Sequence, residues 1–200
     1  MDRAEIARAL TGAWRLFLGR ADAMRFFDAS VEGFWRSFGA VILVAPLYAL
    51  TALADQHDLL TDANPADDFS GGSFWAAKAL TLALDWVTLP ILLGLIADFI
   101  GIRRGYPAYV VARNWATVLM IVPFAAIGLI DLAGIASASV LVLPSLVALA
   151  ATFRMSYQIA RQALGARVDV AVALVALDFL VSLAIVMAAN GLFGLSSLPQ

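Results

Sequence analysis

The chain has 200 residues, of which 62% are hydrophobic and 14% charged, and its mean hydropathy is +0.89. Soluble domains are about 45–50% apolar and about 25% charged, so this composition excludes a soluble globular enzyme and a disordered segment. The net charge of −2 gives no basic excess for phosphates, which excludes a nucleic-acid partner. Without cysteine and with one histidine, thiolate metal sites and bis-histidine cofactor sites are also excluded. What the composition predicts is a small polytopic membrane protein with no cofactor and no metal site.

The N-terminal segment, residues 1–33, is predicted to lie on the membrane surface. Ile6, Leu10, Trp14 and Phe17 recur at three- and four-residue spacing, and arginines fall on the opposite side of the same helix. An apolar face with an aromatic residue opposite a basic face is typical of an interfacial helix. Such a helix would either sense lipid or dock a partner, or it would be a passive anchor that covers the end of the bundle.

The remainder, residues 34–200, contains five apolar stretches that are long enough to span a bilayer. They are predicted at about residues 37–54, 74–102, 108–130, 136–157 and 170–190. The fold class is therefore all-α, a bundle of five transmembrane helices with an amphipathic helix before it. Each of the first four spans contains one internal proline, which would form a hinge, open a cavity or only affect packing.

The basic residues predict the orientation of the bundle. All twelve arginines precede the first span or lie between spans two and three or four and five, and the single lysine, Lys78, begins span two. The positive-inside rule then places the N-terminus in the cytoplasm and the C-terminus in the periplasm, in a bacterial inner membrane. The stretch 55–72 on the other side has five aspartates, and it is predicted to be a solvated acidic loop rather than a cation site.

Two carboxyls inside the spans are the main candidates for chemistry. Asp85 and Asp178 lie near the middle of spans two and five, where an ionised side chain costs about 2.5–3.5 kcal/mol. We expect no Lys or Arg at their depth, so that the neutral acid is favoured. If the two carboxyls meet, they would share a proton in a relay or an ion site, with Thr81, Thr88 and Ser182 nearby. Otherwise each is a hydrogen-bonded side chain that joins neighbouring helices.

A structural ion pair is predicted near the cytoplasmic ends of the spans. Asp98 lies one turn from the end of span two, and Arg113 and Arg154 fall at a similar depth on spans three and four. We therefore expect Asp98 to pair with one of these two arginines and to tie three helices together.

Motifs of the common membrane enzymes are absent from the sequence. There is no HExxH, Walker or GxGxxG motif and no serine elbow. The surroundings of Asp85 and Asp178, LALDWVT and VALDFLV, lack the YD and GxGD motifs of intramembrane aspartyl proteases. We therefore expect no enzymatic activity.

The layout of the whole chain, a cytoplasmic amphipathic segment followed by five spans with the C-terminus outside, resembles the Yip1-type membrane proteins. That resemblance implies a bundle that organises lipids or partner proteins, with the bilayer and a second copy or another membrane protein as partners. The alternative from the residues themselves is a small proton- or ion-coupled transporter or channel component that uses Asp85 and Asp178.

Overall fold

The computed structural model describes residues 2–62 and 71–195. Five of its helices are long and apolar enough to cross a membrane, and the described ranges contain no strand, which confirms the predicted all-α polytopic fold. The elements are α1 (Arg3–Phe17), η1 (Ala23–Phe26), α2 (Val31–Ser37), η2 (Phe38–Ala40), α3 (Val41–Asp62), α4 (Gly72–Ile96), α5 (Tyr106–Leu132), α6 (Ala138–Ala163) and α7 (Val168–Leu192).

The spanning helices extend beyond most ends of the predicted stretches. Because α2, η2 and α3 follow one another without a gap, the first spanning stretch is Val31–Thr61 rather than 37–54. The second ends earlier than predicted: α4 stops at Ile96, and the chain turns away at Gly101, whose φ is 73°. The amide of Ile102 there donates to the carbonyl of Ala97 at 2.9 Å, an arrangement that ends helices.

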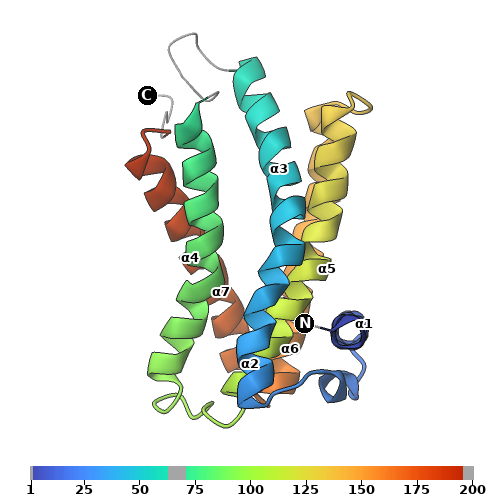
Figure 1. Cartoon of the computed structure of the whole chain (residues 1–200), viewed down its shortest axis with the longest axis vertical. Coiled ribbons are helices and arrows are strands. Elements are labelled where there is room, and N and C mark those ends of the chain that lie inside the picture. Colours follow the sequence, from blue (N-terminus) through green and yellow to red (C-terminus); the bar gives the residue numbers. More distant parts are fainter. Residues whose placement is uncertain (1, 63–70, 196–200) are drawn as a thin grey trace.

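The long helices run side by side, and α1 lies across them near one end of the bundle (Figure 1). Helix α5 packs along α3 and α6, whereas α4 packs along α7, and this second pair joins the others chiefly where α7 meets α6. Helix α5 begins and α6 ends at the same end of the bundle, hereafter the arginine-rich end because Arg103, Arg104, Arg161 and Arg167 lie there. Helix α1 lies near this end.

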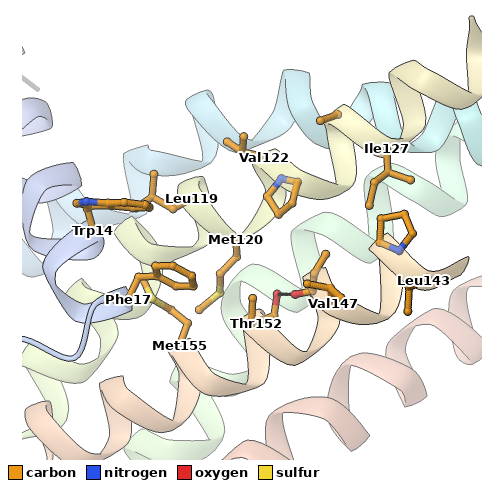
Figure 2. A pocket seen from close by; sticks show the side chains of 15 residues that line it. Trp14, Phe17, Leu119, Met120, Val122, Ile127, Leu143, Val147, Thr152 and Met155 are labelled. Atoms are coloured by element: carbon orange, nitrogen blue, oxygen red, sulfur yellow. Dashed lines mark hydrogen bonds between the residues drawn. The ribbon is translucent and has the colours of Figure 1, made fainter. Parts of the chain in front are cut away.

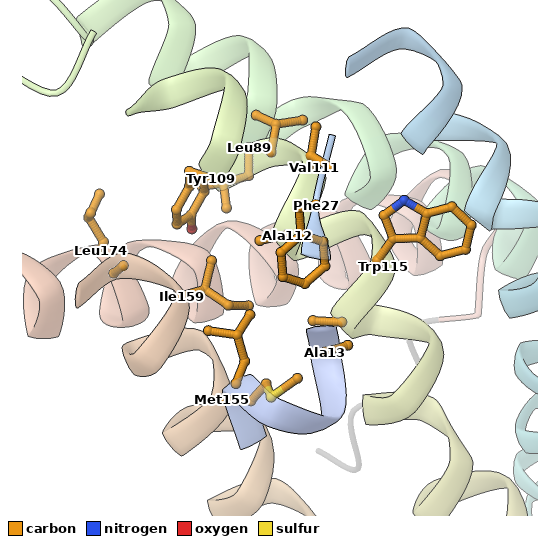
Figure 3. Packing of buried hydrophobic residues seen from close by; sticks show 14 of the residues in the cluster. Ala13, Phe27, Leu89, Tyr109, Val111, Ala112, Trp115, Met155, Ile159 and Leu174 are labelled. Carbon is orange, nitrogen blue, oxygen red and sulfur yellow. The ribbon is translucent and has the colours of Figure 1, made fainter. Parts of the chain in front are cut away.

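The main apolar core surrounds the first turns of α5. Side chains of α1, α4, α6 and α7 meet α5 there, around Trp115 (Figure 3). All eight residues from Tyr109 to Ala116 are buried, because α1, α2, α3 and α6 all contact this helix. Two of the eight, Arg113 and Asn114, are polar, and buried polar groups need partners inside the protein.

Small residues seat α1 on the bundle. Its buried face consists of Ala9, Gly12, Ala13 and Leu16. A Cβ added at Gly12 would lie 2.7 Å from the Cβ of Phe26, so only glycine fits this close approach. Gly12 therefore allows α1 and the η1 segment to pack closely together, and α1 also contacts α5 and α6.

One arginine ties α1 to the helix that leads into the first span. The guanidinium of Arg36 contacts Glu5 of α1 at 3.1 Å, Asp28 at 2.8 Å and Glu32 of α2 at 2.5 Å. These contacts fix α1 relative to α2 by charge as well as by packing.

The acidic segment after the first span is partly helical, which corrects the prediction of a loop. Residues 55–62 form the last two turns of α3, because their sequence contains no glycine or proline to end the helix. Asp55 accepts a hydrogen bond from Lys78 of α4 at 2.5 Å. Asp67 and Asp68 lie outside the described residues. Within the described ranges, no three acidic or histidine side chains are grouped so as to hold a metal.

Candidate functional site

A buried ion pair joins α5 to α7. Arg113 lies seven residues inside α5, about 10 Å from its start. Its Nη2 donates to Oδ1 of Asp178 at 3.0 Å, and Arg113 is only 8% exposed. An arginine at this depth is held by its counter-ion, because neither side chain alone is tolerated in an apolar interior.

A second carboxyl binds the same face of α7. Ser182 lies one turn after Asp178, and its hydroxyl contacts Oδ1 of Asp85 on α4 at 2.5 Å. The nearest part of α4 is fixed by Trp86, whose indole Nε1 donates to the carbonyl of Phe38 at 3.2 Å. Asp85 is therefore held between α7 and the start of the first span.

On the other side of α5, Asn114 donates to the hydroxyl of Ser37 at 3.0 Å, and both residues are fully buried. These contacts link α2, α5, α7 and α4 in sequence. We refer to the six side chains as the polar layer: Ser37, Asp85, Arg113, Asn114, Asp178 and Ser182. Two of its atoms, Nε of Arg113 and Oδ1 of Asn114, are buried without a hydrogen-bond partner in the described part of the chain.

Of the two alternatives left open for Asp85 and Asp178, the polar layer shows the second, in which each carboxyl contacts a side chain of a neighbouring helix. Each carboxyl has a partner of its own, Ser182 and Arg113 respectively. The expectation that no Lys or Arg reaches their depth is wrong. Because α5 begins two turns before Arg113, the arginine lies inside the bundle and not at its edge.

The predicted cluster of Asp98 with Arg113 or Arg154 does not form. Helix α4 ends before Asp98, which is therefore exposed and pairs with Arg103 in the same turn at 2.7 Å. Arg154 donates instead to the carbonyl of Phe17, at the C-terminus of α1, where cations are favoured by the helix dipole. Its guanidinium also lies 5.5 Å from the centre of the Phe17 ring.

The predicted apolar residues of α1 divide into two groups. Ile6, Leu10 and Phe17 are partly buried and pack against the core. Trp14 is 54% exposed and stacks on Phe17 with ring centres 5.4 Å apart. The sequence pattern therefore predicted the position of the helix. The face of α1 that packs against the bundle is the one with small residues, and Trp14 is exposed.

Trp14 and Phe17 close one end of an apolar groove between α5 and α6 (Figure 2). The groove has a volume of about 760 Å³ and extends away from α1 to Ile127 and Leu143. Two of the predicted span prolines, Pro123 and Pro144, line it from opposite sides. The side chains that line it are Trp14, Phe17, Leu119, Met120, Val122, Pro123, Ala126, Ile127, Leu143, Pro144, Val147, Ala148, Ala151, Thr152 and Met155.

The groove offers almost nothing to a polar ligand. Besides the Trp14 indole, its one polar side chain is that of Thr152, whose hydroxyl donates to the carbonyl of Ala148 on its own helix at 3.0 Å. With that hydroxyl satisfied, the lining favours hydrocarbon. The sequence pattern did not reveal the groove. An apolar residue in a span can face lipid, another helix or a groove, and the residue types are the same in all three cases.

Sequence reasoning missed the bond between Ser37 and Asn114 and the partner of Arg113. A signal was present, since Arg113 and Asn114 are adjacent polar residues inside an otherwise apolar span. Two adjacent side chains point to different sides of a helix, which indicates partners on two different helices.

No family model matches the chain, and no curated protein and no solved structure matches it. Its function is therefore argued from the polar layer and from the groove.

Proposed function

We propose that this chain is a non-enzymatic integral membrane protein that binds phospholipid and so organises lipid around itself. The observation that carries this proposal is the groove between α5 and α6, closed at one end by α1. The groove lies along two helices that are each long and apolar enough to span the bilayer. A concave apolar surface at that place is in contact with acyl chains.

The groove is long enough for an acyl chain, which is narrower than a helix of another protein. From Met155 to Leu143 the groove follows twelve residues of α6, or about 18 Å. An acyl chain is unbranched and narrower, so it can lie in the groove along its whole length.

A free positive charge at the α1 end supports an anionic headgroup. A lipid tail gains little by leaving other tails for an apolar groove, so selection must come from shape and from the headgroup. Arg154 is exposed beside Phe17, and among the described residues no carboxylate lies within 4.0 Å of it. A phosphate at this position would lie beside Phe17, at the end of the groove that α1 closes.

The arginine distribution supports an orientation with the arginine-rich end in the cytoplasm and the C-terminus in the periplasm of a bacterial inner membrane. In this orientation the groove faces the inner leaflet at its α1 end. The proposal agrees with the resemblance of the layout to Yip1-type proteins, whose implied role is membrane organisation.

The test compares two alanines that are both exposed, one inside and one outside the groove. Ala126→Trp fills the groove from α5, and Ala188→Trp adds the same side chain to a lipid-facing position of α7. The protein is purified in mild detergent, and the retained phospholipid is counted by mass spectrometry. We expect the wild type and Ala188→Trp to retain phospholipid and Ala126→Trp to lose it.

A phospholipid with a photoreactive group at the end of its acyl chain provides the positive readout. We expect it to label residues of α5 and α6 between Leu119 and Val147 in the wild type. Retention of lipid by Ala126→Trp, or crosslinks between two copies of the chain at this surface, would contradict the proposal.

Transport coupled to Asp85 and Asp178 is the second candidate, and the polar layer supports it. Intramembrane charges commonly mark ion pathways, and these two carboxyls lie on one connected set of polar contacts. Asp85→Asn and Asp178→Asn should each abolish a pH-dependent flux in proteoliposomes. Flux that persists in both variants would reject this candidate.

A further inference from the structure

Three charged side chains from three helices interact in the polar layer. Arg113 of α5 is bonded to Asp178 of α7, and its charge also interacts with Asp85 of α4. Ser182 connects the two acids along α7, one turn from Asp178 and 2.5 Å from Asp85. The group therefore contains two carboxyls and one guanidinium.

The helices that pack near Asp85 bring several titratable groups towards it. Helix α3 brings Tyr48 into the neighbourhood of Asp85. Helix α5 presents Arg113, and α7 presents Asp178 and Ser182. Among the described residues, no Lys or Arg lies within 4.0 Å of Asp85. The positive charge in this region is that of Arg113, and it is bonded to Asp178.

The charges in the polar layer do not balance if both carboxyls are ionised. Two carboxylates and one arginine leave one excess negative charge, which is strongly disfavoured inside a bilayer. We propose that the polar layer is a proton-binding site that takes up one proton from water, held by Asp85 against Ser182. With that proton the layer is neutral, and the ion pair of Arg113 with Asp178 is undisturbed.

Release of the proton would change the balance between the two acids. Asp85 would then compete with Asp178 for Arg113, whose Nε is buried without a partner. Because Asp85 lies on α4 and Asp178 on α7, binding or release of the proton would change how these two helices contact Arg113 of α5. This inference is independent of lipid binding, and it holds whether or not an ion is transported.

Charge counting gives a direct experiment. Infrared spectroscopy of the full chain in lipid vesicles at neutral pH counts protonated carboxyls by their C=O stretching band. A second carboxyl pair, Asp58 with Asp131, meets at the opposite end of the bundle, so all measurements are made in an Asp131→Asn background. In this background we expect the band of a single carboxyl.

Each variant is expected to have one protonated carboxyl for every acid that Arg113 does not neutralise. Asp85→Asn should lose the band completely. Asp178→Asn should lose it as well, because Arg113 then neutralises Asp85. Arg113→Gln should double the band, and Asp98→Asn, which removes an exposed acid paired with Arg103, should leave it unchanged.

The Asp178→Asn variant decides the proposal. A purely structural Asp85 would leave the band unaffected by removal of a different acid, and an unaltered band in this variant overturns the inference. A wild type without a band also overturns it. Gel filtration and circular dichroism confirm that each variant is folded, and if Asp85→Asn does not fold, the Asp178→Asn and Arg113→Gln spectra test the same count.

Discussion

Two regions of the bundle are held together in different ways. Along α3 and α5 the helices approach closely on small residues: a Cβ added at Gly128 would lie 3.1 Å from the Cβ of Ala54. The α4–α7 pair packs on α6 through α7 and is attached to α5 in addition by directed polar contacts, such as the ion pair of Arg113 with Asp178 and the hydrogen bond from Tyr106 to the carbonyl of Pro90 at 2.8 Å. Shape therefore decides stability in the first region, and polar pairing decides it in the second.

The largest loss of stability is expected when one partner of the ion pair between Arg113 and Asp178 is removed. Arg113→Leu leaves the half-buried Asp178 without its counter-ion, and loss of one partner of a buried pair costs about 3 kcal/mol. The free energy of unfolding in mixed detergent micelles measures this loss. The double variant Arg113→Leu/Asp178→Leu should recover most of it, because two apolar side chains replace the pair. A double variant as unstable as the single one would contradict this account.

The close approach of α3 and α5 is tested by adding volume. Gly128→Val places two further methyl groups against Ala54 and should destabilise the bundle by about 1–3 kcal/mol. The same change at Gly191, where a Cβ would meet nothing within 4 Å, should alter the unfolding free energy by less than about 0.5 kcal/mol. Equal effects at both sites would show that shape is not what holds this region.

The sequence predicted the fold because hydrophobic length is a local property. Each span needs about 20 apolar residues in succession, and the five stretches meet that condition without reference to one another. Arg36 illustrates the opposite case. Its contact with Glu32 has the i,i+4 spacing of a helix, but Glu5 is 31 residues away, and no periodicity in the sequence indicates that contact.

The candidate site was predicted only in part, because its pairing depends on where helices end and on which helices pack together. The start of α5 lies only two residues before the predicted start of its span, so the error for Arg113 concerns its partner: Asp178 of α7 is 65 residues away along the chain. An early end of α4 moves Asp98 out to Arg103. Helix ends are the least certain feature of a sequence pattern, so the residues were found but were assigned wrong partners.

A smaller effect is expected for a neutral bond in the polar region. Ser182→Ala removes the hydrogen bond to Asp85 and should cost about 0.6 kcal/mol, the average for hydrogen bonds between membrane helices. Ser145→Ala is the matched control, because its hydroxyl bonds the Leu141 carbonyl of its own helix. Unfolding measurements on both serine variants in an Asp85→Leu background, which has no acceptor for Ser182, should show no difference between them. A difference that persists there would mean that Ser182 acts through another contact.

The smallest effect concerns the exposed charges that hold the turn after α1. Arg15 bonds Asp22 at 2.5 Å, and this hydrogen bond lowers the pKa of Asp22 below its ordinary value of 3.8. A lowered pKa in the folded state stabilises the turn above about pH 4, and the contribution disappears as the pH falls through the folded-state pKa.

Hydrogen exchange of the last α1 amides should therefore accelerate below about pH 4 more than the intrinsic rate predicts, and Asp22→Asn should abolish this excess. Both side chains are 37% exposed, so salt should weaken the contact, in contrast to the buried pair of Arg113 and Asp178. If instead high salt loosened α1 less than it loosened the α4–α7 attachment, the polar layer would be open to solvent. The two regions would then differ in hydration and not in the kind of contact that holds them.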